Sequence, residues 1–403
     1  MIETLMMSVM IINLMIATYL KMRNILSIYK KDPKDNTDLI IVQKYNRDKL
    51  FFSIFSLVLS TIRDIIVIKY RIYQQIYNKW FVNMYMSEVC FFLAIINISS
   101  LLDLPLDLFN TFVIEQMYGF NNTTLTVYAV DFIKKNLIIN ILIFLVLNVV
   151  LNLVYKFLSS FWLYLWVFLS IFQLIMVVIY PVYIQPLFNK FDELEEGDLK
   201  DKINELSKKI GFQASKIFIM DGSKRSSHSN AYFTGLTKEK RIVLFDTLLK
   251  DLSTNEILAV LCHEFGHWFN FHIIKQISFI LLQHLLYFWM TNQVLNSEYI
   301  SKNLFFQNEP LIIKLMYVSF LLTILEFPMM LVNNIISRKY EREADIFAVK
   351  QNYGEDLIKG LNMLEKSNKS HQSPDWLYSM CYNSHPTVLE RVDLIENEMK
   401  KHE

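Results

Sequence analysis

Residues 137–157 read LIINILIFLVLNVVLNLVYKF, an apolar run in which Lys156 is the one charged side chain. A helix needs roughly 20 mostly apolar residues to cross the hydrocarbon core of a bilayer, so this run is long enough to span a membrane. Six other stretches have a similar length and character. They are residues 2–20, 51–68, 82–102, 162–184, 273–292 and 311–335. The sequence therefore predicts seven membrane-spanning helices.

The overall composition favours the same class of protein. Of 403 residues, 53% are hydrophobic and 20% are charged, whereas soluble domains are usually about 45–50% apolar and about 25% charged. The low counts of 8 Gly and 8 Pro favour long helices over a turn-rich β fold. Because 40 Lys and Arg balance 39 Asp and Glu, no basic surplus supports a nucleic-acid partner, and we expect none. Three scattered cysteines indicate neither a disulfide framework nor a cysteine zinc site.

Charged residues interrupt two of the predicted spans. Arg63 and Asp64 lie in the second span, and Glu88 lies in the third. Such side chains are costly in lipid unless they face the protein interior or water. We therefore expect a polar chamber inside the helical bundle, with these three side chains facing it.

Two further regions have a soluble character. Residues 198–210 have helical spacing with mixed charge, residues 216–220 and 241–245 read as short strands, and a helix begins at about Asn255. The expected fold is an all-α membrane protein, with seven helices around a chamber and a mainly helical soluble domain that carries a small β-sheet. The chain then divides into spans one to five (1–185), a soluble segment (186–271), spans six and seven (272–335) and a helical soluble segment (336–403).

The distribution of basic residues predicts the orientation in the membrane. Loop 21–50 carries eight Lys and Arg side chains, whereas loop 293–310 carries one Lys and no Arg. Basic loops remain in the cytoplasm, so loop 21–50 is expected there. Seven spans then place the N-terminus outside, and both soluble segments and the C-terminus in the cytoplasm.

The segment His263-Glu264-Phe265-Gly266-His267 is an HExxH motif. Two histidines four residues apart on a helix face the same way and can bind one zinc ion, while Glu264 is placed to take a proton from a water molecule beside the metal. Ser253 and Glu256 form a capping box that would begin this helix. The alternative is an exposed, charged helix face that binds no metal.

A zinc hydrolase needs a third protein ligand and an open position for water. Glu341 and Asp345 lie four residues apart, so they share one helix face, with Glu343 on another. One carboxylate can bind zinc while the other holds a ligand histidine. By itself the segment would be an ordinary solvated helix, but two predicted spans separate His267 from Glu341, so both can meet on one side of the membrane.

These segments resemble the zinc-dependent CAAX prenyl proteases, multi-spanning enzymes that trim prenylated proteins and a farnesylated mating pheromone. Besides the two motifs above, the matching segments are Leu104-Pro105, Thr111-Phe112-Val113-Ile114-Glu115 and Gly119-Phe120-Asn121 in a loop before the fourth span, residues 186–189, 227–233, 241–248 and 384–386, and Glu390-Arg391. Each match is modest evidence. The ordered set covers most of the chain and is very specific.

The resemblance implies one zinc ion per chain, bound by His263, His267 and Glu341, with Glu264 as general base and later proton donor. It places Asn230 where the family holds the substrate backbone, although an asparagine there could equally cap a turn. Segment 228–234 could present a strand edge along which an extended peptide adds. His228 is expected to be structural, because zinc needs no fourth protein ligand.

One segment departs from the family pattern. Tyr382 stands where the family has a histidine that helps to stabilise the oxyanion of the transition state. A tyrosine hydroxyl can donate such a hydrogen bond but carries no positive charge. His385 is a candidate substitute, and its alternative is a packed residue that anchors the last helix.

The resemblance also implies substrate and location. The substrates would be prenylated CAAX proteins or peptides, from which the last three residues are removed, with a second, N-terminal cleavage of some substrates. The protein would lie in the endoplasmic reticulum membrane, with the nuclear envelope as a further location. Lys400-Lys401-His402-Glu403 has the form of a dilysine retrieval signal or, equally, of a solvated terminus. The alternatives are a heat-shock-type membrane metalloprotease for quality control and a catalytically silent seven-span protein.

Overall fold

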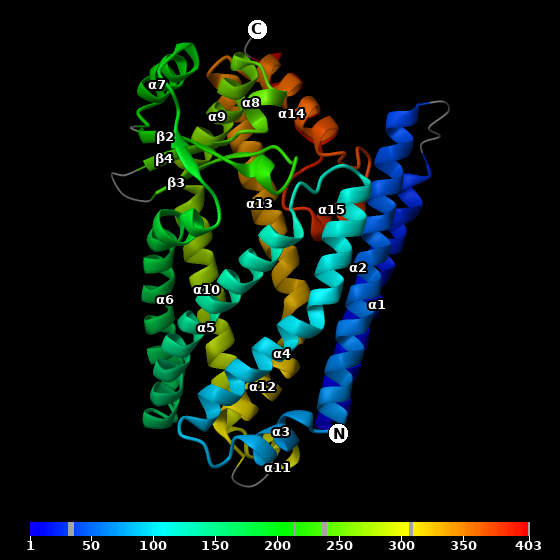
Figure 1. The fold of residues 1–403 in the computed structure, drawn as a ribbon, viewed down its shortest axis with the longest axis vertical. Coiled ribbons are helices and arrows are strands. Elements are labelled where there is room, and N and C mark those ends of the chain that lie inside the picture. The colour runs from blue at the N-terminus through cyan, green and yellow to red at the C-terminus, as the bar shows by residue number, and fades with distance from the viewer. Residues whose placement is uncertain (31–35, 213, 236–239, 306–308, 402–403) are drawn as a thin grey trace.

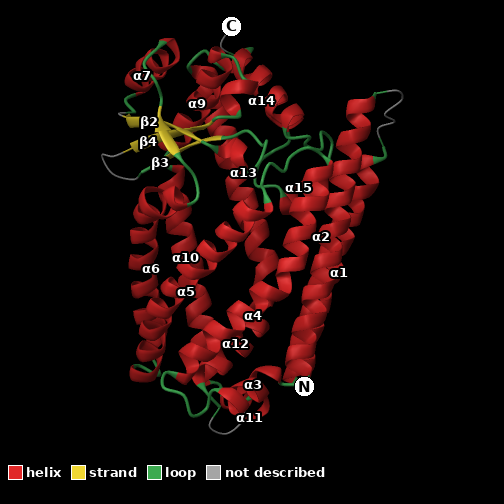
Figure 2. Cartoon of the chain, viewed as in Figure 1, coloured by secondary structure: helices red, strands yellow, loops and turns green. Residues whose placement is uncertain are grey.

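The computed structural model describes residues 1–30, 36–212, 214–235, 240–305 and 309–401. Lys31, Lys34, His402 and Glu403, on which the loop and retrieval-signal predictions partly rest, lie outside these residues. The chain is largely helical and carries one small sheet (Figure 2).

Seven helical segments are long and apolar enough to cross a membrane, as the sequence predicts. They are α1 (Ile2–Ile28), α2 (Thr37–Lys69), α4 (Ser87–Phe109) continued by the π-helical η1 (Asn110–Glu115), α5 (Leu125–Lys156), α6 (Phe161–Ile179) continued by η2 (Tyr180–Ile184) and η3 (Gln185–Leu187), α10 (His272–Asn296), and α12 (Leu311–Leu322) continued by η5 (Thr323–Leu325) and α13 (Glu326–Lys350). Most of these helices extend beyond the predicted spans, because charged and polar turns continue them outside the hydrocarbon core.

The remaining elements lie at the two ends of the bundle (Figure 1). One end has the N-terminus and the short helices α3 (Ile72–Trp80) and α11 (Glu298–Leu304). The other has β1 (Phe191–Glu193), α7 (Asp198–Ile210), β2 (Ala214–Met220), η4 (Gly222–Lys224), β3 (Ala231–Thr234), β4 (Lys240–Phe245), α8 (Leu248–Asp251), α9 (Thr254–Phe269), α14 (Gly354–Ser367), α15 (Trp376–Tyr382) and α16 (Val388–Met399). The two soluble segments therefore meet on one side of the bundle.

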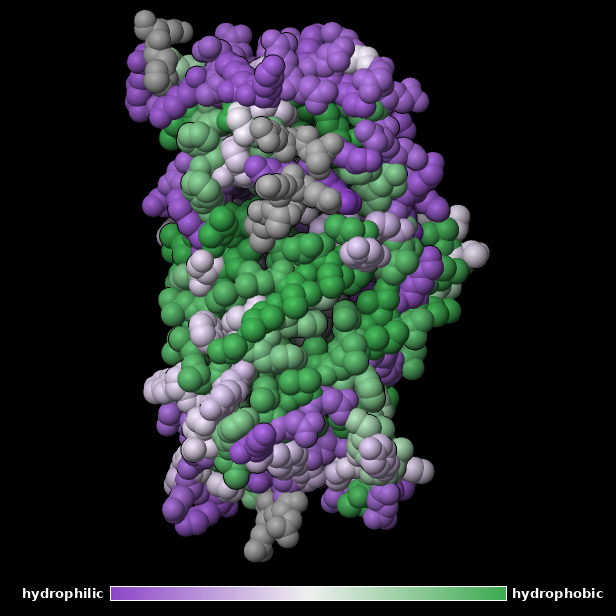
Figure 3. Space-filling model, turned by 90° about the vertical axis from the view of Figure 1, so that its left-hand side faces the viewer, coloured by the Kyte–Doolittle hydropathy of each residue, from purple (hydrophilic) through white to green (hydrophobic). Residues whose placement is uncertain are grey.

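A hydrophobic belt surrounds the bundle between these ends. Figure 3 shows a broad band of hydrophobic side chains between two hydrophilic ends. On α5, Leu137, Ile141 and Leu145 are each more than half exposed and recur every four residues, so they form one outward face. Such a continuous apolar surface would not stay in water, and it fits the hydrocarbon core of a bilayer.

A cavity of about 810 Å³ lies among α1, α2, α10, α12 and α13. Its polar lining includes Asn13, Lys21, Asp64, His284 and Glu326. The expectation that Asp64 faces a polar chamber is therefore confirmed.

The prediction that Glu88 faces the chamber is wrong. Glu88 lies in the first turn of α4, and its Oε2 accepts a hydrogen bond of 2.7 Å from the backbone N–H of Ile312 at the start of α12. The first N–H groups of a helix have no partner within the helix and carry partial positive charge, so a carboxylate is favoured there. Arg63, which is also expected to face the chamber, is not among the described residues that line this cavity. Its Nη1 instead lies 2.7 Å from Oδ1 of Asp103 on α4.

The expectation of a loop at Leu104-Pro105 and Thr111–Glu115 is also wrong. The helix passes through Pro105 and continues as the π-helical η1 to Glu115. Pro105 removes one backbone hydrogen bond from α4, and the π turns begin only at Asn110.

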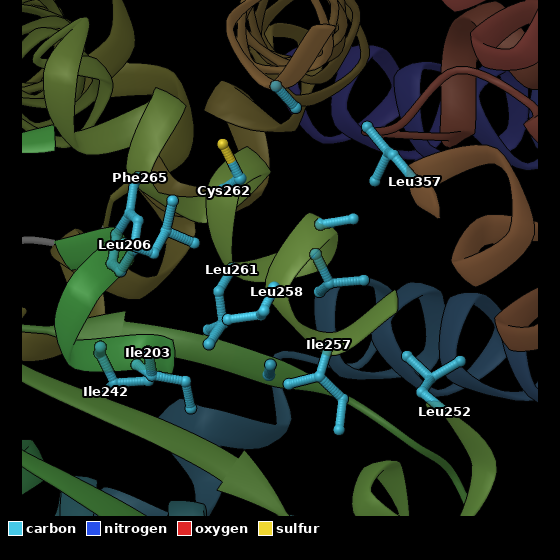
Figure 4. Packing of buried hydrophobic residues seen from close by; sticks show 14 of the residues in the cluster. Ile203, Leu206, Ile242, Leu252, Ile257, Leu258, Leu261, Cys262, Phe265 and Leu357 are labelled. Atoms are coloured by element: carbon cyan, nitrogen blue, oxygen red, sulfur yellow. The ribbon is translucent and has the colours of Figure 1, made fainter. Parts of the chain in front are cut away.

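The sheet has the strand order β1-β2-β4-β3, with β2 and β4 parallel and the two outer pairs antiparallel. The predicted strands at 216–220 and 241–245 are present as β2 and β4. Helix α9 packs with the sheet around Ile242, Leu258, Leu261 and Phe265, which are all buried (Figure 4). The expected capping box of Ser253 and Glu256 begins α9, so the helix that carries the HExxH motif is fixed at both its first turn and its inner face.

Candidate active site

Three candidate metal ligands come together from two helices. The Nε2 atoms of His263 and His267 on α9 are 3.1 Å apart. Glu341 on α13 places Oε2 3.4 Å from the first of them and Oε1 3.2 Å from the second. Ligands about 2.0–2.2 Å from a tetrahedral zinc ion lie about 3.3–3.6 Å from one another. The three side chains therefore fit a single metal ion.

The chemistry of the donors agrees with this spacing. Glu341 is 4% exposed, so its carboxylate is almost entirely removed from water. A buried charge is unfavourable unless it is paired or coordinates a metal, and a cation bound between Glu341 and the two histidines would compensate it. The residues present therefore fit a metal ion held by two imidazoles and one carboxylate.

A buried ion pair holds the first histidine. Nδ1 of His263 lies 2.8 Å from Oδ1 of Asp345, which is completely buried. Arg391 of α16 donates two hydrogen bonds to the same carboxylate, at 2.6 and 2.9 Å. Sequence reasoning placed Asp345 beside a ligand histidine but gave Arg391 no role. The helix that carries Arg391 is far away in sequence, so no local pattern pointed to this contact.

Glu264 lies beside the three ligands and has a perturbed pKa. Loss of solvent around its carboxyl group raises the pKa to about 7, although the neighbouring His263 opposes this shift. Among the described residues, no side chain makes a hydrogen bond or ion pair with Glu264. Its carboxylate is therefore available to a water molecule.

The other predicted site residues differ in their distance from the ligands. Nδ1 of His385 lies 2.8 Å from Oε2 of Glu341, and the His385 side chain is 62% exposed. Tyr382, by contrast, lines the 810 Å³ cavity, where burial raises the pKa of its hydroxyl to about 12. The structure thus brings His385, rather than Tyr382, into contact with a ligand.

Asn230 lies just before β3 and is exposed. Its Oδ1 accepts a hydrogen bond of 2.8 Å from the backbone N–H of Ala231. Within the described part of the chain it makes no hydrogen bond to the three ligands. Its side chain therefore bonds to the neighbouring backbone in this structure.

His228 joins the soluble segments to the membrane helices. Its ring stacks on Phe120 at 4.0 Å, and its Nδ1 lies 2.8 Å from Oδ1 of Asn368. Its Nε2 is 3.7 Å from Glu115, which also binds Lys49. These contacts explain His228 without a metal.

Sequence reasoning missed two residues beside His267. Nδ1 of His267 lies 3.0 Å from Nδ1 of His272, and Nε2 of His272 lies 2.9 Å from Oε2 of Glu343. The one available signal was a third histidine five residues after the motif. Five residues do not return to the same face of a straight helix, so that signal pointed away from the site.

Gly266 allows α9 to pack closely against α13. A Cβ atom at this position would lie 2.9 Å from the Cα of Ala344 and 3.1 Å from the Cβ of Phe347. We expect Gly266→Ala to separate the two helices, to lower the free energy of unfolding by about 1–3 kcal/mol, and to weaken metal binding, because Glu341 would move away from the histidines. Thermal unfolding and metal content of the purified protein measure both effects.

Gly360 on α14 provides the matched control. A Cβ atom there would be 3.5 Å from Val260 Cγ2, which is an ordinary contact. Gly360→Ala should leave metal content unchanged and stabilise the helix by up to about 1 kcal/mol, because alanine has a higher helix propensity. Equal behaviour of the two variants would contradict the close-packing role of Gly266.

Comparisons with known proteins agree with these observations. A family model described as CAAX prenyl protease N-terminal, five membrane helices, matches residues 32–190, and the model of peptidase family M48 matches residues 193–399. CAAX prenyl protease 1 of Saccharomyces cerevisiae is 37% identical over 390 residues, which cover 89% of this chain and 86% of that protein. The CAAX prenyl protease 1 homologue of Homo sapiens is 35% identical over 355 residues, which cover 78% of this chain and 74% of that protein. The crystal structure of S. mikatae Ste24p superimposes with a TM-score of 0.91 at 36% identity and covers 98% of each chain.

Proposed function

Because this chain belongs to the CAAX prenyl protease family of the M48 peptidases, it is a metalloprotease of CAAX processing, and we propose that its metal is zinc. One zinc ion per chain would bind His263, His267 and Glu341. The observation that carries this assignment is the spacing of 3.1–3.4 Å among their ligand atoms. Two imidazoles and one carboxylate are a ligand set typical of hydrolytic zinc enzymes, with a fourth position open to water.

The bound metal would polarise the scissile carbonyl and lower the pKa of a water molecule. Glu264 accepts the proton of the attacking water and later delivers it to the leaving amine. Asp345 keeps the proton of His263 on Nδ1, so that Nε2 of this histidine remains a ligand atom. His385, exposed and next to Glu341, donates a hydrogen bond to the developing oxyanion.

The substrate peptide adds as a strand along β3, the last strand of the sheet. Asn230, at the start of this strand, holds the substrate backbone by turning its amide from Ala231. Tyr382 contacts the substrate from the wall of the chamber. The substrates are prenylated CAAX proteins or peptides that lose their last three residues, and some of them undergo a second, N-terminal cleavage.

The same family membership and the charge distribution support a proposed location. We place the protein in the endoplasmic reticulum membrane, with the nuclear envelope as a further location, and its C-terminus in the cytoplasm. The end of α1 and the start of α2, which carry Arg23, Lys44 and Arg47, lie at the same end of the bundle as both soluble segments, and this arrangement supports the proposed orientation.

Cleavage of a farnesylated CAAX peptide by the purified full-length protein tests the function. We expect release of the C-terminal tripeptide, loss of this release after treatment with a chelator, and its recovery when zinc is added back. Zinc content is measured on the same samples, so that metal loss and activity loss can be compared directly.

Two other results would support the alternative functions. A zinc-loaded protein that leaves the farnesylated peptide intact but digests an unfolded, unprenylated membrane protein would be a quality-control protease. A protein with neither zinc nor activity would be catalytically silent. The match of residues 32–190 to the CAAX prenyl protease N-terminal model favours CAAX processing over a quality-control protease, and the three joined ligands favour it over a silent protein.

A further inference from the structure

The two candidate ligand histidines are held in different ways. His263 is held directly by a carboxylate, through its Nδ1 and Asp345. His267 has no direct carboxylate partner on its Nδ1 among the described residues. That atom instead lies 3.0 Å from Nδ1 of His272, and Nε2 of His272 lies 2.9 Å from Oε2 of Glu343.

In the series of hydrogen bonds from His267 through His272 to Glu343, the position of each proton follows from the position of the metal. If Nε2 of His267 donates its lone pair to the metal, its proton must be on Nδ1. That proton is then donated to Nδ1 of His272, which must be unprotonated. The proton of neutral His272 is therefore on Nε2 and is donated to the carboxylate of Glu343. In this one arrangement, each N–H group of the two imidazoles donates to an acceptor.

We propose that His272 and Glu343 are positioning residues for the metal ligand His267, and that they replace a direct carboxylate by a relay through a second imidazole. This inference rests on the zinc site of the proposed function. The relay fixes the tautomer and the ring orientation of His267, as Asp345 does for His263.

The burial of His272 makes the relay specific. His272 is 2% exposed, so its ring nitrogens cannot exchange their partners for bulk water, and an unpaired nitrogen would be unfavourable. Its ring stacks on Tyr340 with the ring centres 4.2 Å apart and the planes at 12°. His272 also begins α10, one residue after the left-handed turn at Phe271. The relay therefore links α9, the first turn of a membrane helix, and α13.

A packing role is the rival explanation, because Tyr340 and Glu343 also hold the ring by stacking and charge. The zinc affinity of the purified, full-length protein distinguishes the relay from the packing role. We would measure this affinity by competition with a chromophoric chelator. His272→Phe keeps a ring over Tyr340 but removes both nitrogens. Glu343→Leu removes the acceptor, and Glu343→Gln keeps a neutral acceptor oxygen for His272.

We expect His272→Phe and Glu343→Leu each to weaken zinc binding by about 10–100-fold, and Glu343→Gln to recover most of the loss. If Glu343 acts through His272, Glu343→Leu has no further effect in a His272→Phe background.

Lys339→Gln controls for loss of the exposed ion pair between Lys339 and Glu343, whose charged atoms are 3.8 Å apart. This variant should bind zinc as the unmodified protein does. The absorption spectrum of the cobalt-substituted protein should shift in His272→Phe, because the orientation of His267 changes.

The outcomes separate the relay from the zinc site itself. Wild-type zinc affinity in both His272→Phe and Glu343→Leu would overturn the relay and leave the zinc site intact. Equal additional loss from Glu343→Leu in both backgrounds would overturn the relay in favour of a packing role. An unmodified protein that binds no zinc would overturn the proposed zinc site, and the relay with it. Should His272→Phe fail to fold, the pair Glu343→Leu and Glu343→Gln, at a partly exposed side chain, decides the question.

Discussion

Glu264→Gln is expected to lower the rate of cleavage of a farnesylated CAAX peptide by about 10²–10⁴-fold, the usual contribution of a general base. Glutamine has nearly the same shape as glutamate but cannot accept a proton from water. Zinc content should stay unchanged, because His263, His267 and Glu341 are untouched. The kcat of the purified variant and its zinc content check the two halves of this expectation.

A matched control comes from the same side of the membrane. Glu355 is an exposed glutamate in the first turn of α14, and Glu355→Gln makes the same chemical change outside the site. Its kcat should equal that of the unmodified protein. If Glu264→Gln retained more than a tenth of the activity, another group would have to take the proton.

Asp345→Ala is expected to lower the free energy of unfolding by about 3–5 kcal/mol, because it removes the hydrogen-bonded counter-charge of the buried Arg391. Among the described residues, only Glu341 then remains as an ion-pair partner, 3.7 Å away. The Asp345 carboxylate is completely buried and accepts two hydrogen bonds from the guanidinium. Zinc binding should weaken as well, because His263 loses the acceptor for its Nδ1 proton. Thermal unfolding of the detergent-solubilised protein, with and without zinc, measures the change.

Two further variants separate stability from metal binding. Asp356→Ala breaks an exposed ion pair with Lys359 on α14 and should change the free energy of unfolding by no more than about 1 kcal/mol. The double variant Asp345→Leu with Arg391→Met replaces the buried pair by apolar side chains and should regain much of the stability. It should not regain zinc affinity. Full recovery of both properties would show that Asp345 serves the fold alone.

Local patterns were sufficient to predict several elements. Helix α7 begins and ends where the charge pattern of residues 198–210 predicts it, because Gly211 takes a left-handed conformation that ends the helix. Helix α9 begins at a capping box of neighbouring residues. These helix boundaries depend on residues close together in sequence. The placement of Glu341 near the HExxH histidines required, in addition, the count of two spans between them.

The structure departs from the sequence predictions, or adds to them, where distant segments make contact. Nothing near Glu88 indicates that it caps α12, because Ile312 lies on another helix. The contact of His272 with His267 depends on the left-handed turn at Phe271, whose φ of 56° is unusual for a residue with a side chain. The positions of Tyr382 and His385 depend on how a short helix and a loop dock on the bundle, and no periodic pattern encodes such docking.

The turn at Phe271 has a consequence for how the protein meets its substrate. Only four residues separate His267 from the start of α10 at His272, so the proposed zinc site lies where that helix enters the membrane. A prenylated chain end is itself held at the bilayer surface by its lipid. Enzyme and substrate are then both confined to the same membrane and meet by diffusing along it. The quantity that governs their encounter is the number of substrate molecules per unit area of membrane, rather than per unit volume of cytoplasm.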